Sequence, residues 1–432
     1  MSELLGKNVS RRRLVQTTAA GAAFAATHRF NVVSAQGAQK FTALMWSNSP
    51  TIDENFKNRA RMFNEEHAGQ FEVDLQFLPY DQYWQKIQLA YAANKPYDIY
   101  FWDVQAYGHY KNDLLLPLQP MIDAAGLFDP AEYPTELFQP WKFDGQSFYA
   151  LPENFQTNGL YYNKTLFDQA GLAVPDETWT WDQVVEAARA LTQRRGERVT
   201  QWGMTLGNLG IWWGLQTLSW AKGTAFMDKQ IEPTKFLMSE PANIETLKFA
   251  QDLIHVEQVA PSPAVAEQSA DTTNFASGRV GLLLEGSWAI SGYRDVPFEW
   301  GMAPIPMLGE NRVPPYWMGG WVIAKNSPAT DAAFEWARWS ATDYQSQMAQ
   351  DHDWIPIRNE ARTSEAMISG MPAGYQQVVD ALSMARLGDF YTTNNQQIWT
   401  EAFDPNLTQL YAGEIAPEQT AKAIDDKANS LL

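Results

Sequence analysis

The chain has 432 residues, a formal net charge of −18 and no cysteine. A chain this acidic is repelled by nucleic acids and by anionic lipid surfaces, so we expect neither as a partner. The lack of cysteine excludes disulfides, thiolate metal sites, iron–sulfur clusters, cysteine catalysis and a lipid-modified cysteine anchor.

The first 35 residues have the features of an export signal. The run Ser10-Arg11-Arg12-Arg13-Leu14-Val15 precedes a weakly apolar stretch of Ala, Thr and Gly, which is typical of a twin-arginine (Tat) signal that directs folded cargo to its translocase. Val33-Ser34-Ala35 offers small residues to a signal peptidase, so we expect cleavage after Ala35. The twin-arginine translocase is therefore an expected partner and the periplasm the expected location. The alternative is a disordered basic segment on a cytoplasmic protein.

After the signal, strands and helices alternate, as in a parallel, doubly wound sheet. Ligands in such sheets bind beyond the carboxyl ends of the strands, which here are Trp46 to Asn48 and Trp102-Asp103. The length favours two lobes rather than one core. The expected elements are a strand over Lys40–Trp46, a helix begun by a capping box at Thr51–Glu54 with Ile52, Phe56, Ala60 and Phe63 buried, a strand over Phe71–Leu78, a helix over about 81–93 and a strand over 98–102.

A second unit is expected to begin near Gly159. Thr180-Trp181-Asp182-Gln183 forms a second capping box, and its helix turns Val184 and Leu191 inward. The remaining expectations are a helix over about 241–256, a glycine turn and buried strand over 275–284, an extended connector over 302–306, one long helix near 331–350, a short crossing over 353–358 and a helical tail.

Aromatic residues make up 13% of the chain, and 18 of them are tryptophan. Several fall in turn-rich stretches where core packing does not demand them. The C–H faces of a pyranose stack on indole planes, while polar side chains at the edge bind its hydroxyls. The pattern predicts a sugar-binding cleft, and the alternative is that each ring fills a core. The aromatic residues in question are Trp212, Trp213, Trp288, Tyr316, Trp317 and Trp321.

No cofactor or metal is expected. The five histidines are scattered, and no Gly-x-Gly-x-x-Gly or phosphate-loop pattern occurs. Asp351-His352-Asp353 lacks the glycine and distal glutamate of a calcium loop.

A set of motifs in this order resembles the maltose-binding-protein-like solute-binding proteins of sugar ABC importers. The resemblance covers nearly the whole chain after the signal. Each motif alone is loose, and together they are specific. The motifs are Tyr149-Ala150-Leu151-Pro152, Gly159 to Phe167, Ala170-Gly171-Leu172, Thr180-Trp181-Asp182, Phe275 to Trp288, Gly319-Gly320-Trp321 and Pro356-x-Arg358.

The resemblance implies an α/β, two-lobed periplasmic-binding-protein fold (type II), in which two doubly wound sheets are joined by hinge crossings. It implies a monomer that closes on a sugar and delivers it to ABC permease transmembrane subunits. The implied N-terminal lobe comprises 40–154 and 305–353, the C-terminal lobe 159–300 and 357–432, and the hinges lie near 155–158, 303–307 and 354–356.

The resemblance also implies the residues that face the cleft. Trp288 matches the family's stacking tryptophan in the second lobe, and Tyr83 and Trp213 are added from their neighbourhood. Other roles remain open for three residues: a turn for Gly320, a surface ion pair for Arg358 and a helix cap for Asp103. The implied ligand-binding set is Trp46, Asn48, Tyr83, Trp102, Asp103, Gln156, Trp213, Trp288, Gly320, Trp321 and Arg358.

Two other functions stay open at this point. A secreted glycoside hydrolase would need two carboxylates, and Asp103, Glu153 and Glu285 are available. The family resemblance also includes binders of polyols and glycerophosphodiesters. The size, charge, linkage and anomer of a sugar ligand are not determined by the sequence.

Overall fold

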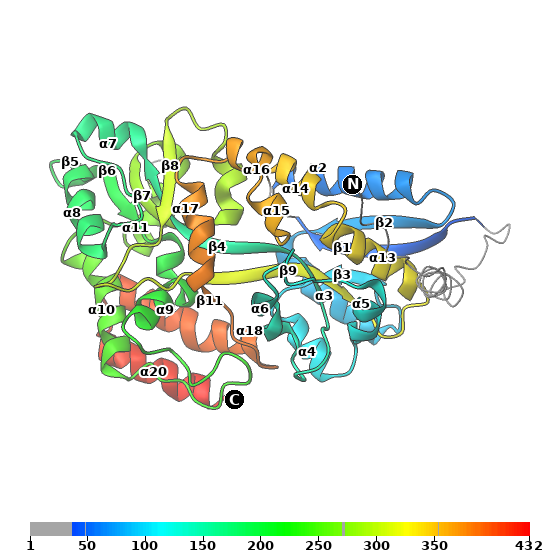
Figure 1. The fold of residues 1–432 in the computed structure, drawn as a ribbon. Coiled ribbons are helices and arrows are strands. Elements are labelled where there is room, and N and C mark those ends of the chain that lie inside the picture. Colours follow the sequence, from blue (N-terminus) through cyan, green and yellow to red (C-terminus); the bar gives the residue numbers. More distant parts are fainter. Residues whose placement is uncertain (1–36, 48, 270–272, 353) are drawn as a thin grey trace, which may run out of the picture.

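The computed structural model describes residues 37–47, 49–269, 273–352 and 354–432 (Figure 1). The expected signal segment and Asn48 lie outside these described residues. None of the described helices is long and apolar enough to cross a membrane.

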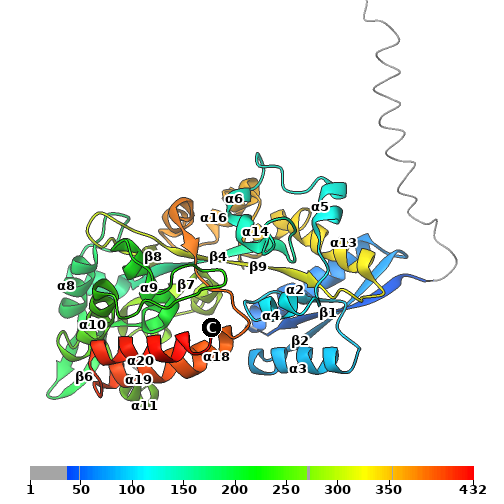
Figure 2. The same cartoon turned by 90° about the horizontal axis from the view of Figure 1, so that it is seen from below.

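Two lobes lie side by side and share one sheet of 11 strands, with the order β2-β1-β3-β9-β4-β7-β6-β5 (Figures 1 and 2). Strands β10 and β8 pair with β4, and β11 pairs with β9. The expected two-lobed α/β fold is confirmed. The strands are β1 (Gln39–Trp46), β2 (Phe71–Leu78), β3 (Ile99–Phe101), β4 (Leu151–Asn163), β5 (Gln193–Arg195), β6 (Arg198–Thr205), β7 (Val280–Gly286), β8 (Trp300–Pro304), β9 (Pro315–Ile323), β10 (Ile355–Pro356) and β11 (Arg386–Leu387).

Helices cover the sheet of each lobe. Around β1, β2 and β3 in the first lobe lie α2 (Pro50–Glu66), α3 (Tyr80–Ala92), α4 (Ala106–Lys111), α5 (Gln119–Ala125), α6 (Thr135–Phe138), α13 (Thr330–Ala341), α14 (Gln345–Asp351), α15 (Asn359–Arg362) and α16 (Glu365–Ser369). The second lobe carries α7 (Lys164–Ala170), α8 (Trp181–Leu191), α9 (Trp212–Ala221), α10 (Pro241–His255), α11 (Pro263–Gln268), α17 (Tyr375–Asp380), α18 (Asn395–Ile398), α19 (Asp404–Ala412) and α20 (Pro417–Asn429). Single turns of 3₁₀ helix cover 139–141, 207–210, 275–277 and 381–384, a longer one covers 287–293, and a π-helical turn covers Trp399–Phe403.

The first lobe begins with parallel strands, as the alternating pattern predicts. Strand β1 pairs in parallel with both β2 and β3. Helix α2 buries the four predicted residues, but its cap is Ser49 rather than Thr51: the Ser49 hydroxyl accepts the N–H of Ile52 at 3.3 Å. The cap therefore lies two residues earlier, because Pro50 is well suited to the first helical position.

The second lobe has its own core around β6 and β7. The capping box at Thr180 is confirmed, since its hydroxyl accepts the N–H of Gln183 while the Gln183 side chain accepts the N–H of Thr180. Helices α19 and α20 pack against α10 on this lobe (Figure 2).

Strand β4 runs unbroken from one lobe into the other. Up to Thr157 it pairs with β9, and from Asn158 onward it pairs with β7 and β8. The change of partner between Thr157 and Asn158 marks the first crossing between the lobes. Figure 1 shows β4 and β9 running together across this junction.

The second crossing lies later than the resemblance implies. Residues 303–307 belong to the second lobe, because Met307 bridges to Thr180 and Ile305 packs in the second core. The chain crosses along β9 instead. Beyond the third crossing at β10, α15 and α16 pack on α14, so the start of the expected stretch 357–432 stays with the first lobe.

The long helix expected near 331–350 is two helices. Helix α13 ends at Ala341, where the terminal carbonyl accepts the Tyr133 hydroxyl at 3.4 Å and the Thr342 hydroxyl bonds back to the carbonyl of Arg338 at 2.8 Å. These contacts satisfy carbonyls that a continued helix would bond internally, so the chain turns before α14 starts at Gln345.

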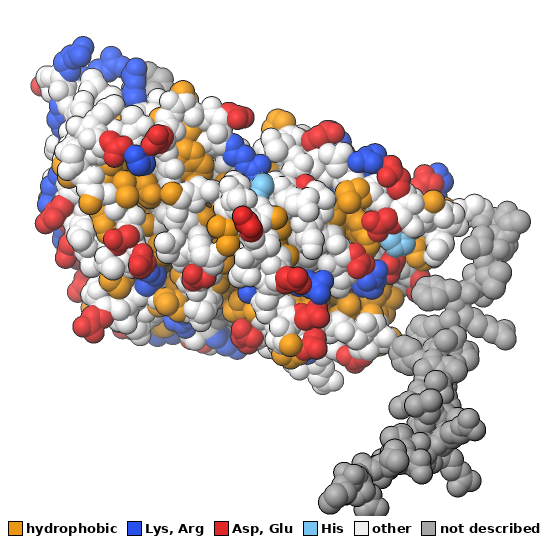
Figure 3. All heavy atoms as spheres, turned by 45° about the horizontal axis from the view of Figure 1, so that its top comes forward, with side chains coloured by type: hydrophobic (Ala, Val, Ile, Leu, Met, Phe, Trp, Pro, Cys, Tyr) orange, Lys and Arg blue, Asp and Glu red, His pale blue; other side chains and the backbone are white. Residues whose placement is uncertain are grey.

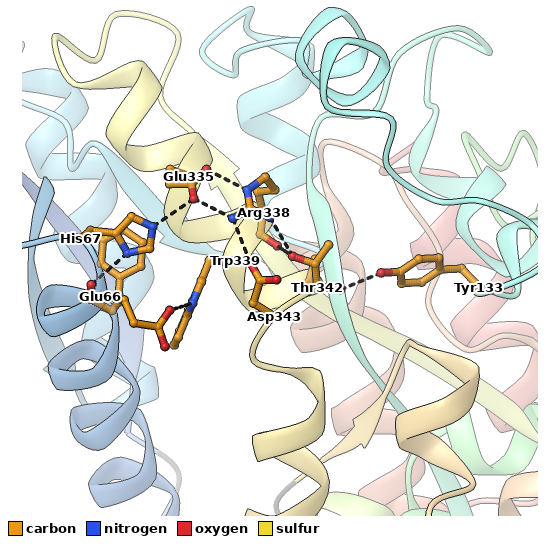
Figure 4. A network of polar contacts seen from close by, with 10 residues as sticks. Glu66, His67, Tyr133, Glu335, Arg338, Trp339, Thr342 and Asp343 are labelled. Carbon is orange, nitrogen blue, oxygen red and sulfur yellow. Dashed lines mark hydrogen bonds and ion pairs between the residues drawn. The ribbon is translucent and has the colours of Figure 1, made fainter. Parts of the chain in front are cut away.

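A polar network ties this turn to the end of α2 (Figure 4). Arg338 pairs with Glu335 at 2.7 Å and with Asp343 at 2.9 Å, and His67 contacts Glu335 at 3.0 Å. Burial alone would raise the pKa of Glu335, but Arg338 and His67 hold it below its usual value. The network therefore fixes α13 against α2 on the outside of the first lobe.

An ion pair lies fully buried in the same lobe. The Arg59 guanidinium on α2 is 2.9 Å from both carboxylate oxygens of Glu153 on β4, and the two side chains are 1% and 0% exposed. Glu153 sits at a β-bulge, because the pairing with β9 shifts between Pro152 and Asn154. The bulge re-aims this side chain away from the ladder. The Trp321 indole N–H also donates to Glu153, at 2.7 Å.

We expect Arg59→Met to lower the free energy of unfolding by about 3–5 kcal/mol, because Glu153 would remain buried without its counter-ion. Arg61→Met, two residues along α2, is the matched control. Its ion pair with Glu65 is exposed, and we expect a loss of about 0.5 kcal/mol or less. Urea unfolding followed by circular dichroism measures both, and equal losses would contradict a stabilising role for the buried pair.

Candidate functional site

A cavity of about 400 Å³ lies between the lobes, close to the crossings. Its volume falls in the usual range for small-molecule sites, about 300–1,000 Å³. Eight of the 18 tryptophans line it, together with one tyrosine and one phenylalanine. The lining residues are Trp46, Tyr80, Phe101, Trp102, Asp103, Val104, Asn154, Gln156, Trp212, Trp213, Trp288, Trp317, Met318, Gly319, Trp354, Asp389, Asn395 and Trp399.

The first-lobe wall forms where β1 and β3 end. Trp46 is the last residue of β1, and its ring meets Tyr80 edge-on at 5.6 Å and Phe101 at 5.2 Å. Trp102 follows β3 and stacks on Phe143 at 5.4 Å. The edge of a parallel sheet thus presents two indoles to the cavity, as the sheet topology predicts.

The second-lobe wall is built from short helical segments. Trp288 lies in the 3₁₀ segment that follows β7, and its ring is 5.2 Å from that of Trp317 on β9. Trp213, at the start of α9, meets Trp399 edge-on at 4.9 Å. Trp399 opens the π-helical turn Trp399–Phe403, a distortion that is frequent at binding sites.

Amide side chains line the floor of the cavity. Gln156 on the crossing strand accepts the Ser287 hydroxyl of the second lobe at 2.6 Å and donates to Asn154 at 3.3 Å. Asn158, two residues further along β4, accepts the Asn208 side chain at 3.0 Å. A row of amides therefore follows one face of β4 through the crossing.

Two carboxylates face the cavity. Asp103 accepts the Tyr80 hydroxyl and the N–H of Val104, and Asp389 accepts the Trp317 indole N–H at 3.1 Å. Burial raises the pKa of Asp103. Burial, and secondly the charge of Asp103, raise the pKa of Asp389 to about 8, although the Trp317 N–H opposes the shift.

The structure brings six of the eleven sequence-predicted site residues to the cavity wall. Asn48 lies outside the described residues, and four others need correction. The six residues at the wall are Trp46, Trp102, Asp103, Gln156, Trp213 and Trp288.

The four corrected residues lie behind or away from the wall. Tyr83 is fully buried beneath Trp46 and donates its hydroxyl to the carbonyl of Phe101 at 2.7 Å. Trp321 is fully buried and bonds Glu153. Gly320 packs against Leu151, whose carbonyl oxygen would lie 2.2 Å from an added Cβ, and its neighbour Gly319 lines the cavity instead. Arg358 pairs with Glu132 at 3.1 Å, which is the surface role that the sequence analysis left open.

Sequence reasoning assigned no site role to Asn154, Trp354, Asp389, Asn395 or Trp399. Asp389 and Trp399 fall in the stretch expected as a helical tail, where no motif marked them. Gly388 was the available signal: its N–H bonds the carbonyl of Tyr316, and an added Cβ would lie 2.5 Å from the Trp317 ring. This close approach places the Asp389 carboxylate next to Trp317, whose indole N–H donates a hydrogen bond to it.

Comparison with known proteins identifies the kind of chain that carries this cavity. Residues 46–345 match the family described as bacterial extracellular solute-binding protein. A maltodextrin-binding protein of Bacillus subtilis is 23% identical over 284 residues, covering 62% of this chain and 64% of that protein. A mannitol-binding protein of Pseudomonas aeruginosa is 30% identical over 280 residues, covering 59% and 60%. The matched region thus spans less than two thirds of either relative.

The fold matches solved structures over a longer stretch. An ABC substrate-binding protein from Listeria monocytogenes, in complex with cycloalternan, superposes with a TM-score of 0.80 at 20% identity. The alignment covers 91% of this chain and 99% of that one. At this identity the likeness shows the fold.

Asp389→Asn tests the titration of the cavity. The folded protein holds a proton on Asp389 up to a pKa of about 8, whereas an aspartate with the ordinary value of 3.8 has already ionised. The wild type therefore loses stability as pH rises between about 4 and 8, and the variant does not lose this contribution. We expect the difference in unfolding free energy to shift in the variant's favour by on the order of 1–3 kcal/mol over that interval.

Urea unfolding at about pH 4.5, 6 and 8 measures the shift. Asp380→Asn, which removes an exposed carboxylate from α17, is the control for the change in net charge. A difference for Asp389→Asn that stays constant with pH would contradict the burial of this carboxyl group.

Proposed function

The chain belongs to the bacterial extracellular solute-binding protein family, and from that premise we propose that it captures a saccharide between its lobes and delivers it to an ABC importer. Proteins of this family bind substrates without converting them. The observation that carries the proposal is the cavity between the lobes, with its eight tryptophans and its row of amides.

The chemistry of the wall fits a pyranose. Indole planes from both lobes offer apolar faces for the C–H surfaces of a sugar ring, while Asn154, Gln156, Asp103, Asp389 and Asn395 offer polar atoms for its hydroxyls. The named ligands of the relatives support this class. Maltodextrin and cycloalternan are saccharides, and mannitol is a sugar alcohol. Flat aromatic walls favour a ring over an open-chain polyol.

Closure of the lobes would complete the site. Trp46 and Trp102 belong to the first lobe and Trp213 and Trp288 to the second, so a ligand in this cavity would contact both lobes at once. The crossings through β4 and β9 are the segments about which this approach would occur. A ligand that binds the closed form shifts the population toward it, and a permease can then recognise the occupied receptor.

Charges of both signs are interspersed over both lobes on the face shown in Figure 3.

Hydrolysis is a poorer reading of the same residues. Of the three acids considered for a glycoside hydrolase, only Asp103 lines the cavity: Glu153 is fully buried against Arg59, and Glu285 does not belong to the lining. We therefore propose a receptor without catalytic activity that acts as a monomer in the periplasm. Its export through the twin-arginine pathway, without a lipid anchor, rests on Arg11 to Arg13 and on the lack of cysteine.

Trp288→Ala tests the saccharide site. Thermal unfolding of the wild type against a panel of mono- and oligosaccharides should identify ligands that raise the melting temperature, because they bind only the folded state. For such a ligand, Trp288→Ala should weaken binding about 10-fold or more, since the ring loses its stacking face. Trp300→Phe, which alters a ring stacked on Tyr161 outside the cavity, is the control. Equal affinity of Trp288→Ala and wild type would contradict the proposed stacking.

Replacing both Arg11 and Arg12 by lysine tests the export route. We expect the precursor to accumulate in the cytoplasm, because the translocase distinguishes the arginine pair from other basic residues. Fractionation of cells followed by immunoblotting measures the distribution. Replacement of Lys7 by arginine leaves the arginine run intact and serves as the control. Normal export of the double variant would rule out the twin-arginine pathway.

A further inference from the structure

Among the described residues, the cavity is lined by acidic and not by basic side chains. Asp103 and Asp389 line it, and no lysine, arginine or histidine does so among the described residues. Nearby basic side chains have other partners: Arg59 pairs with Glu153, Lys111 with Glu232 and Arg358 with Glu132, and the Arg386 guanidinium lies over the Trp220 ring. The site therefore has no internal counter-ion for its two carboxylates.

The donors that reach these carboxylates are neutral. Asp103 receives the Tyr80 hydroxyl and a backbone N–H, and Asp389 receives one indole N–H on Oδ1. No donor from the described residues reaches Oδ2 of Asp389. A carboxylate that is taken out of water without a cation is unfavourable, and the raised pKa values of both groups have that cause.

The aromatic wall also favours a positively charged partner. Ring faces carry the negative end of the aromatic quadrupole, so indoles attract cations as well as C–H surfaces. Trp317 is next to Asp389, and its ring is 5.2 Å from that of Trp288 and 6.5 Å from that of Trp213. A positive group beside Asp389 would therefore meet a carboxylate and a cluster of indoles together.

A neutral sugar satisfies only part of this environment. Its hydroxyls can donate to Asp103, but Asp389 would stay protonated, because burial and the neighbouring Asp103 oppose its ionisation. An anionic sugar would add a negative charge beside Asp103 and oppose the ionisation of Asp389 further. A protonated amine would compensate the charge of Asp103 and stabilise the ionised form of Asp389, to whose Oδ2 it can donate.

We propose that the ligand is an amino sugar, a saccharide whose protonated amino group lies against Asp389 and Asp103 while its ring stacks on the surrounding indoles. This inference rests on the proposed function and narrows its substrate class. It assigns selectivity for charge to Asp389, a residue at the junction of the two lobes, and selectivity for shape to the tryptophans.

Matched sets of ligands test the proposal with the full folded protein. Each set contains an amino sugar, its neutral hydroxyl parent and its N-acetyl derivative: glucosamine, galactosamine and mannosamine as monosaccharides, and the chitosan disaccharide with cellobiose and di-N-acetylchitobiose. Calorimetry at about pH 6, where a primary amine is protonated, gives the dissociation constants. We expect the amine of at least one set to bind about 30-fold or more tightly than its two neutral partners, as for a desolvated charge pair.

In Asp389→Asn, the ratio of the dissociation constants of the neutral parent and the amine should fall close to one. The amide keeps the shape of the side chain and an oxygen for the Trp317 N–H, and its ligand-free melting temperature shows that it folds. Asp380→Asn on α17 removes an exposed carboxylate and should keep the ratio of the wild type. An unchanged ratio in Asp389→Asn would overturn the role assigned to this residue.

The outcomes separate this inference from the proposed function. If neutral sugars bind as tightly as their amines, the amino-sugar inference fails and the saccharide receptor stands. If no saccharide of any set or of the wider panel binds, the proposed function fails and this inference fails with it.

Discussion

The buried pair of Arg59 and Glu153 supports the strand on which the rest of the site is built. Glu153 stands at the bulge where β4 begins its passage between the lobes, and it receives Arg59 from α2 and Trp321 from β9. Gln345 completes the arrangement from α14: it donates to the carbonyl of Glu153 at 2.9 Å and accepts the N–H of Ile357 at 2.8 Å. The start of the first crossing is thereby joined to the third. Because a bulge re-aims side chains, Glu153 turns into the first lobe while Asn154 and Gln156 line the cavity.

Strand β4 is unusual in being wholly buried and strongly polar. All 13 of its residues are buried, yet Asn154, Gln156 and Asn158 follow one another on the same face. A buried polar group is tolerated when it has a partner, and these side chains bond to one another, to Ser287 and to Asn208. The bonds to Ser287 and Asn208 reach into the second lobe. The crossing strand therefore carries both the floor of the cavity and the polar contacts that link the lobes.

Local pattern predicted much of the fold, and the limits of that prediction are physical. The alternation in β1 and β2 and the capping box at Thr180 depend on residues close in sequence. Trp288 and Trp321 show where such reasoning ends: both follow glycines in loose motifs, but one lines the cavity and the other bonds Glu153 in the core. Composition cannot distinguish a tryptophan that binds a ligand from one that fills a core. Gly388 hints at a close approach beside Asp389, but no local pattern identifies the partner, because that partner is Trp317, 72 residues earlier.

The aromatic wall and the two carboxylates act on each other through solvation. Each indole that excludes water lowers the local polarity, and this strengthens every charge–charge interaction in the cavity. The same exclusion makes an uncompensated carboxylate more unfavourable, which is why Asp389 holds its proton to a pKa of about 8. In an open cleft, water can hydrate the carboxylates. In a closed cleft, a ligand would have to supply the hydrogen bonds and the charge compensation that water supplies in the open one. If the lobes close as proposed, closure without such a ligand would be opposed by the chemistry of the wall, and the cavity would couple the approach of the lobes to the identity of the molecule between them.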